Sequence, residues 1–196
     1  MSRIILKSLL CTTLVAFVLG FGPAQRLVTF SSLTSCKTAR HSILLHMGMK
    51  VNIRIVGRKS GSEKWIDEAC SMYETRLRPS NVEVETTWHK DNPALVKGVE
   101  TDKSKGHSIV LLDPLGASKT SEKFSDNMYE WLDRGGSRLS FIIGGAEGLP
   151  NELKYGGKPD MISLSAMTFT HQFARVLLIE QIYRATEIRK GSGYHK

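Results

Sequence analysis

Three segments join a short apolar run to residue types that could bind a ligand. They are LDPLG at 112–116, FIIGGAEG at 141–148 and SLSAMTFTH at 163–171. Paired glycines after an apolar run let backbone atoms approach a ligand closely, because no Cβ intervenes. By itself, Gly144-Gly145 fits a simple turn equally well. Neither a G-x-G-x-x-G fingerprint nor a Walker loop is present, which argues against NAD and ATP as ligands.

Alternating and apolar patterns predict that these segments follow strands. Residues 51–56 alternate apolar and polar side chains and end at Gly57, as a strand does. The other runs with strand character are 82–88, 108–112, 139–143 and 161–164. Asp113-Pro114 closes the run at 108–112. Because open α/β sheets bind ligands beyond the carboxyl ends of their strands, the three segments are candidates for one site.

Helical patterns alternate with these strands. Ser62 is suited to cap a helix whose apolar residues recur at helical spacing up to Leu77, before Pro79. Residues 90–106 are polar with weak periodicity and predict a mobile loop or a frayed helix. The remaining expected helices have an inner face of Phe124, Met128, Trp131 and Leu132, or span 150–155 and 172–189. This order predicts an α/β domain with a largely parallel sheet.

The N-terminal part differs from the rest in charge. Residues 1–49 contain five Lys or Arg and no Asp or Glu, whereas residues 50–196 carry 22 basic and 19 acidic side chains. The net charge of +8 falls to about +3 without the leader, so any RNA affinity must come from a local patch. Cys70 is the one cysteine of residues 50–196 and lies on an apolar stripe, which predicts a core position and neither a disulfide nor a metal site.

Residues 1–48 have the composition of a targeting segment. Arg3 and Lys7 precede an apolar run at 9–21 that is too short and too interrupted to favour a membrane span. Residues 22–46 are rich in Ser, Thr, Arg and Lys and lack acidic residues, as organelle transit peptides do. A signal-like segment followed by a transit-like segment resembles the two-part presequences of algae with secondary plastids.

Other interpretations of this leader stay open. A single mitochondrial or chloroplast presequence fits almost as well, and a disordered extension is the simplest alternative. Initiation at Met47 or Met49 would instead give a cytoplasmic protein. We expect import into a plastid or mitochondrion, with residues 49–196 forming the mature domain and no membrane association.

The C-terminal third carries a specific pattern of residues. They are Ser163 to His171, Arg175, Glu180, Gln181, Tyr183, Arg184, Ala185 and Gly193 to Lys196. Together with Gly144-Gly145-x-x-Gly148 upstream, this pattern closely resembles the bacterial 23S rRNA pseudouridine N3-methyltransferases of the SPOUT class, in the same order and at similar distances. The likeness spans residues 49–196.

The resemblance implies a SPOUT-type sheet with a C-terminal trefoil knot and an S-adenosylmethionine (AdoMet) site at that knot. Loop amides and carbonyls would recognise the adenine, with apolar packing from the side chains. Thr170 stands where the family leads us to expect proline, which could loosen the cofactor loop. The implied cofactor contacts are Leu112, Gly144, Gly145, Ser165, Ala166, Met167, Thr168, Phe169 and Thr170.

Arg184, Tyr194 and His195 match family positions that hold the target nucleotide. Arg184 would stabilise a developing imidate oxygen or hold a phosphate, and His195 would orient the base or accept its proton. Each also has a simpler interpretation. Arg184 follows Glu180 by four residues, so a surface ion pair would explain it, and His195 would be ordinary tail surface. His171 is as well suited to cap a helix or position a loop as to catalyse.

The resemblance therefore implies AdoMet-dependent methylation of N3 of a pseudouridine in large-subunit rRNA, here of an organellar ribosome. It also implies a homodimer that recognises an assembled ribosome, since the domain is too small for a separate RNA-binding module. Two alternatives stay open. The enzyme could methylate another loop nucleotide in rRNA or tRNA, or the chain could be a non-catalytic ribosome-assembly factor of the same fold.

Overall fold

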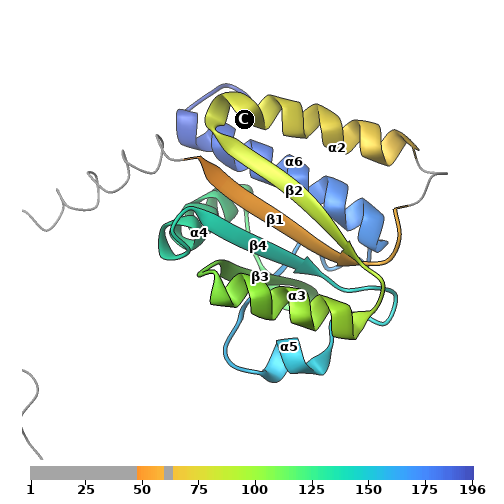
Figure 1. Cartoon of the computed structure of the whole chain (residues 1–196). Coiled ribbons are helices and arrows are strands. Elements are labelled where there is room, and N and C mark those ends of the chain that lie inside the picture. The colour runs from red at the N-terminus through yellow and green to blue at the C-terminus, as the bar shows by residue number, and fades with distance from the viewer. Residues whose placement is uncertain (1–47, 60–63) are drawn as a thin grey trace, which may run out of the picture.

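The computed structural model describes residues 48–59 and 64–196. The expected leader and the expected helix cap at Ser62 lie outside the described residues. Within the described part, five strands form one parallel sheet of order β2-β1-β4-β3-β5 (Figure 1). They are β1 (Met49–Val56), β2 (Val82–His89), β3 (Ser108–Ser118), β4 (Arg138–Ile143) and β5 (Asp160–Ser163). The predicted α/β domain with a parallel sheet is confirmed, and the trefoil knot stays a prediction.

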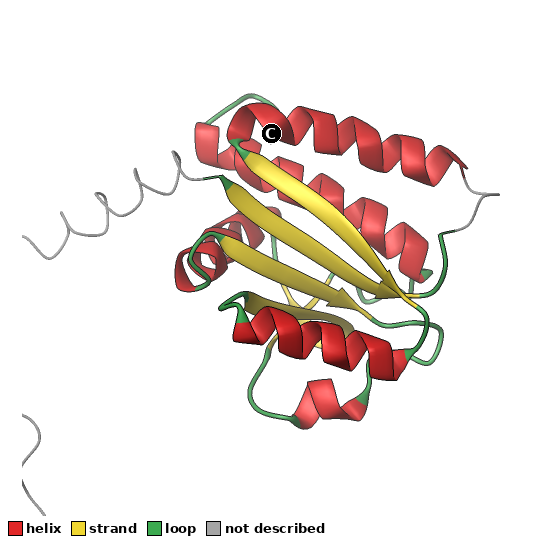
Figure 2. Ribbon diagram, viewed as in Figure 1, coloured by secondary structure: helices red, strands yellow, loops and turns green. Residues whose placement is uncertain are grey.

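Helices cover both faces of this sheet (Figures 1 and 2). α2, α4 and α6 pack on one face, and α3 and α5 lie on the other. No helix in the described ranges combines the length and apolar character needed to cross a membrane. The helices are α2 (Lys64–Leu77), the 3-10 turn η1 (Arg78–Ser80), α3 (Asn92–Ser104), α4 (Ser121–Arg134), α5 (Asn151–Tyr155) and α6 (His171–Lys190).

Alternation along β4 divides the apolar core between the two faces. Phe141 packs with the α2, α4 and α6 side, whereas its neighbour Ile142 packs with the α3 and α5 side. The Phe141 ring stacks on Phe124 at 6.1 Å between centroids and meets the edge of Trp131, also at 6.1 Å. Cys70 is buried in the same cluster, which confirms the core position that the sequence predicts. The three-layer arrangement therefore rests on side chains whose spacing is visible in the sequence.

Within residues 90–106, Asn92–Ser104 form the regular helix α3, so of the two expectations, a mobile loop or a frayed helix, the loop is wrong. Asp91 caps α3, because its side chain accepts a hydrogen bond from a backbone amide of the first turn. The buried face of α3 is Leu95, Val99 and Asp102, at positions i, i+4 and i+7. A carboxylate therefore occupies a position where an apolar side chain is the norm. The presence of Asp102 on the buried face explains why the apolar periodicity of the segment is weak.

Asp102 belongs to a buried polar network between α3 and the sheet. Arg54 of β1 donates from Nε and Nη2 to the two carboxylate oxygens of Asp102, at 2.6 and 2.7 Å, and Ser140 of β4 donates at 2.6 Å. Burial raises the pKa of Asp102, but these hydrogen bonds outweigh it and lower the pKa below its usual value. A Cβ on Gly98 would lie 2.7 Å from Arg54, so α3 approaches closely only with glycine there.

β3 continues beyond Asp113-Pro114, where the sequence predicts its end. Its pairing with β5 runs to Leu112, is interrupted, and resumes at Ala117 and Ser118. The irregularity between these points lifts residues 113–116 out of the ladder. Proline fits there because the bulged segment needs no ladder hydrogen bond from its backbone nitrogen.

We predict that Asp102→Asn lowers the free energy of unfolding by about 3–5 kcal/mol, because it leaves the Arg54 guanidinium buried without its counter-charge. Asp126→Asn is the matched control, since Asp126 is exposed and lies 3.9 Å from Lys123, and it should cost less than about 1 kcal/mol. Urea unfolding measures both. Equal effects of the two substitutions would contradict a structural role for the buried network.

The dependence of the unfolding free energy on pH tests the same Asp102 interaction. A carboxyl with a depressed folded-state pKa stabilises the fold above its unfolded pKa of about 4 and loses that contribution as pH falls through the folded value. The unfolding free energy of the wild type should therefore fall on acidification below about pH 4 more steeply than that of Asp102→Asn.

Candidate functional site

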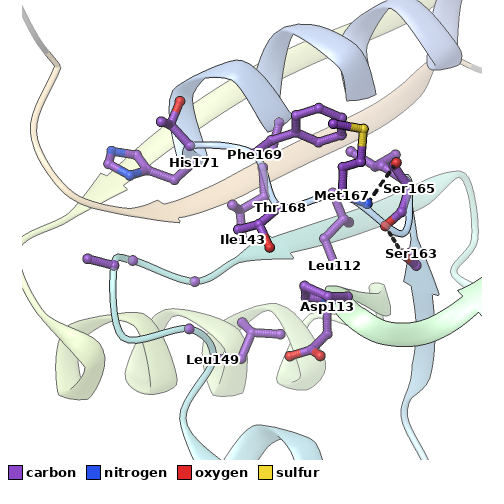
Figure 3. A pocket seen from close by; sticks show the side chains of 18 residues that line it. Leu112, Asp113, Ile143, Leu149, Ser163, Ser165, Met167, Thr168, Phe169 and His171 are labelled. Atoms are coloured by element: carbon purple, nitrogen blue, oxygen red, sulfur yellow. Dashed lines mark hydrogen bonds between the residues drawn. The ribbon is translucent and has the colours of Figure 1, made fainter.

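A cavity of about 530 Å³ lies beyond the carboxyl ends of β4 and β5 and beside the irregular part of β3 that follows Leu112 (Figure 3). The three segments singled out in the sequence all contribute to its lining. Ala166 belongs to the same loop as its neighbours but is not one of the lining residues. The predicted contacts that do line the cavity are Leu112, Gly144, Gly145, Ser165, Met167, Thr168, Phe169 and Thr170.

The loop between β5 and α6 is tied by its own hydrogen bonds. The Ser163 hydroxyl donates to the Ser165 carbonyl at 2.7 Å, and the Ser165 hydroxyl accepts from the Met167 amide at 3.0 Å (Figure 3). Thr170 caps α6, because its hydroxyl accepts from the Phe173 amide at 3.4 Å. Its φ of −61° is one that proline also adopts. Threonine at this position therefore keeps the loop geometry and adds a cap, contrary to the expected loosening.

The glycine loop after β4 closes on itself. Gly145 and Gly148 form an antiparallel bridge, with the Gly148 amide donating to the Gly145 carbonyl at 3.0 Å. A Cβ on Gly144 would overlap the backbone of Gly148. One on Gly145 would lie 3.1 Å from Val56 of β1. The glycines therefore shape this wall of the cavity by close approach of protein to protein, and not only by approach of backbone to ligand.

Asp113 places a buried charge in the cavity wall that sequence reasoning missed. Its carboxylate lies 2.5 Å from Nζ of Lys154 in α5 and accepts from the Leu115 amide at 3.0 Å. Burial raises the pKa of Asp113, but these two donors outweigh it and lower the pKa, so the group is an anion. The available signal was an aspartate directly after a buried strand. Its partner on α5 was not visible in the sequence.

His171 lines the cavity and is packed into place by apolar and glycine contacts. Its ring meets the Trp88 ring edge-on at 6.4 Å, and a Cβ on Gly57 would lie 3.0 Å from its Nε2. The helix cap is Thr170, so the expectation that His171 might cap α6 is wrong. One turn later, buried Arg175 donates to Asp67 of α2 at 2.7 Å and lies 5.2 Å from the Trp88 ring centroid. These contacts hold the start of α6 against α2 and β2.

The three residues expected at the target nucleotide form a second cluster. Arg184 donates to Oε1 of Glu180 from Nε at 3.1 Å and from Nη2 at 2.7 Å. The Tyr194 hydroxyl donates to the same oxygen at 3.1 Å, and the Tyr194 ring lies 4.8 Å from the Arg184 guanidinium carbon. His195 contacts Arg184 from the C-terminal tail. The ion pair expected under the simpler interpretation is therefore present, but as part of a wider network.

Aromatic contacts fix the tail that carries Tyr194 and His195. The Tyr194 ring meets the edge of Tyr183 on α6 at 4.9 Å, and Tyr183 lies 5.8 Å from Tyr73 on α2. Burial, followed by the hydrogen bond to Glu180, raises the pKa of Tyr194 to about 12. Tyr194 is therefore a neutral hydroxyl donor at physiological pH, held over the Arg184 guanidinium.

The cavity and this second cluster lie at different positions along α6. His171 begins the helix at the cavity, and Arg184 follows almost four turns later. At 1.5 Å per residue this separation is roughly 20 Å. Within one chain, therefore, the cluster is too far from the cavity for both to contact the same pair of reacting atoms.

Comparison with known proteins gives a consistent family. Residues 49–195 match the family model described as "Predicted SPOUT methyltransferase". The chain is similar to proteins named "Ribosomal RNA large subunit methyltransferase H". The relative from Protochlamydia amoebophila is 47% identical over 148 residues, 76% of this chain and 99% of the relative. That from Ruminiclostridium cellulolyticum is 36% identical over 76% of this chain and 100% of the relative, and that from Prochlorococcus marinus is 35% identical over 73% and 95%.

We predict that Gly144→Ala lowers AdoMet affinity at least about tenfold, because the added methyl group would overlap the Gly148 backbone and change the conformation of the glycine loop. Gly48→Ala is the control, since a Cβ there meets no atom within 4 Å and Gly48 lies outside the cavity. Calorimetric titration with AdoMet measures both affinities. Unchanged affinity in Gly144→Ala would show that the loop does not contribute to the cofactor site.

Proposed function

Because this chain belongs to the SPOUT methyltransferase family, we propose that it methylates N3 of a pseudouridine in large-subunit rRNA, with AdoMet as methyl donor. The cavity at the carboxyl edge of the sheet carries this proposal, since it joins the three segments that the family resemblance assigned to the cofactor. The names of relatives that the chain covers almost end to end support rRNA as the substrate class. An assembled ribosome or large subunit is the proposed substrate particle.

The residues around the cavity fit AdoMet. Its volume lies within the roughly 300–1,000 Å³ typical of small-molecule sites. Leu112, Ile143 and Leu149 supply apolar walls, and the loop from Ser165 to Thr170 would supply the backbone contacts to the adenine that the family resemblance implies. When bound there, AdoMet would supply a methyl group on a good leaving group. Asp113 is paired with Lys154, so this part of the wall is polar without a net charge.

The second cluster has the chemistry needed to hold the acceptor base. Methylation of N3 requires that its proton leave, and an imidazole such as that of His195 is a common general base. Arg184 offers forked donors to the imidate oxygen that develops beside N3, and Tyr194 offers a neutral hydroxyl. Glu180 orients both, because one of its oxygens accepts from each of them.

A homodimer would bring the cavity and the Arg184 cluster together. Within one chain the two lie roughly 20 Å apart along α6, so we propose that the Arg184 cluster of one protomer faces the cavity of its partner. Exposed apolar side chains on the face formed by α2 and α6 support a contact there. The exposed fractions of Trp65 and Phe173 are 53% and 39%, and their rings lie 6.1 Å apart.

We also propose that the protein acts on an organellar ribosome, in a plastid or mitochondrion. The support is the composition of residues 1–48, which are basic, free of acidic side chains and rich in Ser and Thr after an apolar run. Residues 1–48 fused to a fluorescent protein should direct it to an organelle when expressed in an alga with secondary plastids. Diffuse cytoplasmic fluorescence would instead favour initiation at Met47 or Met49.

We predict that Arg184→Ala slows single-turnover methylation of ribosomes by roughly 30- to 1,000-fold while AdoMet affinity stays nearly unchanged. Arg134→Ala is the matched control, because Arg134 forms an exposed ion pair with Asp160 away from the cluster. Nucleoside mapping of the product identifies the acceptor. A normal rate in Arg184→Ala would remove it from the site, and AdoMet binding without any transfer by the wild type would favour a ribosome-assembly factor.

Mixing the two defective variants tests the homodimer. If each active site combines the cavity of one protomer with Arg184 of its partner, a heterodimer of Gly144→Ala and Arg184→Ala contains one intact site. After unfolding and joint refolding, half of the dimers are mixed, so activity should recover to about a quarter of the wild-type value. A site confined to one chain predicts no recovery, since each protomer then carries a defect.

A further inference from the structure

The C-terminal tail is attached to α4 as well as to α6. Glu122, in the first turn of α4, places Oε1 2.8 Å from Nε2 of His195, 73 residues further along the chain. The same turn is fixed against α6, because the Ser121 hydroxyl donates to Oε1 of Gln181 at 2.9 Å. No sequence pattern singled out Glu122, because a residue 73 positions before His195 forms no recognisable motif with it. The position of the tail imidazole therefore depends on a helix that the family motif does not include.

Glu122 is itself held in place and charged. Hydrogen bonds with the Thr120 side chain, which caps α4, and then with His195 lower the pKa of Glu122 to about 2. A carboxylate in the first turn of a helix is also favoured by the helix dipole. Glu122 is therefore an anion that can only accept hydrogen bonds at any pH at which ribosomes are intact.

The two partners of His195 assign the proton on its ring. On one side the Glu122 carboxylate can only accept, so the neutral imidazole donates to it from Nε2. On the other side Nη1 of Arg184 lies 3.4 Å from Nδ1, and a guanidinium can only donate. Nδ1 therefore carries the lone pair, and it faces the same guanidinium that the proposed function places at the acceptor base.

We propose that Glu122 is a positioning residue for methyl transfer, which keeps His195 in the Nε2–H tautomer with its Nδ1 lone pair directed toward the acceptor. This inference rests on the proposed function. In this step N3 would take the methyl group of AdoMet, whose sulfur would leave as S-adenosylhomocysteine. The N3 proton would pass to Nδ1 in exchange for the Nδ1 contact with Nη1 of Arg184. The resulting imidazolium would keep its Nε2–H bond to the Glu122 carboxylate. Without Glu122, the ring can rotate or carry its proton on Nδ1, and either change removes the base from the acceptor.

The test compares three variants of the full chain. Glu122→Ala removes the acceptor and should slow single-turnover methylation on the order of tenfold, because complete loss of a general base costs roughly 100-fold or more. Glu122→Gln keeps a carbonyl that can accept from Nε2 and should restore part of the rate. Glu130→Ala is the matched control, since Glu130 lies two turns further along the same helix and its side chain contacts Asn127. AdoMet affinity should be unchanged in all three.

Nitrogen NMR of the imidazole gives a readout independent of activity. The His195 signals, assigned by their loss in His195→Ala, should show the Nε2–H tautomer in the wild type and a mixture of tautomers in Glu122→Ala. The double variant Glu122→Ala/His195→Ala should be no slower than His195→Ala, because Glu122 acts through the ring.

The outcomes separate the two proposals. A normal methylation rate in Glu122→Ala, an unchanged tautomer, or an equal loss of AdoMet affinity would overturn the positioning role. Additive effects in the double variant would also overturn it, since Glu122 would then act elsewhere. If the wild type transfers no methyl group to ribosomes, the proposed function fails, and the positioning role for catalysis fails with it. The Nε2–H tautomer would then stand as a structural property of the tail.

Discussion

The parallel direction of every strand pair is the constraint on which the rest of the structure depends. Parallel strands run to the same edge, so the loops after β4 and β5 meet the irregular segment of β3 that follows Leu112, although the three are distant in the chain. Pairing of β3 with both β4 and β5 fixes their relative heights. A slip of one residue would turn Phe141 out of the core and separate the glycine loop from the cofactor loop.

α6 connects the cavity at the sheet edge to the cluster that contains Arg184. Its first turn forms part of the cavity, and its second half bears Glu180 and Arg184. Buried Arg175 ties the helix to Asp67 of α2, and Ser125 of α4 donates to its backbone at Ala185. A rigid helix held at several points sets the distance between the cavity and the Arg184 cluster. One element therefore positions both features and its length separates them, which is the basis of the proposal that two protomers form each active site.

Buried ion pairs have two different roles in the domain. Under α3, the Arg54 guanidinium donates two short hydrogen bonds to the Asp102 carboxylate, and the Ser140 hydroxyl donates a third. Such a network tolerates no unpaired member in a low-dielectric interior. In the cavity wall, Asp113 is paired with Lys154 but still borders the ligand space. The same chemistry thus clamps α3 in one place and ties α5 to the cavity wall in another.

The sequence by itself determined the order of most strands and helices and the core face of α4, which have a local signal in the side-chain period. Its resemblance to a known family singled out three candidate cofactor segments and the candidate acceptor residues of the tail. Only the tertiary structure decided that α3 is a full helix, because its buried face ends in Asp102, whose partner lies on β1. It also decided that Glu122 holds His195 and that Arg184 lies far from the cavity. Contacts between residues distant in the chain leave no periodic trace, so they become visible only when the chain is folded.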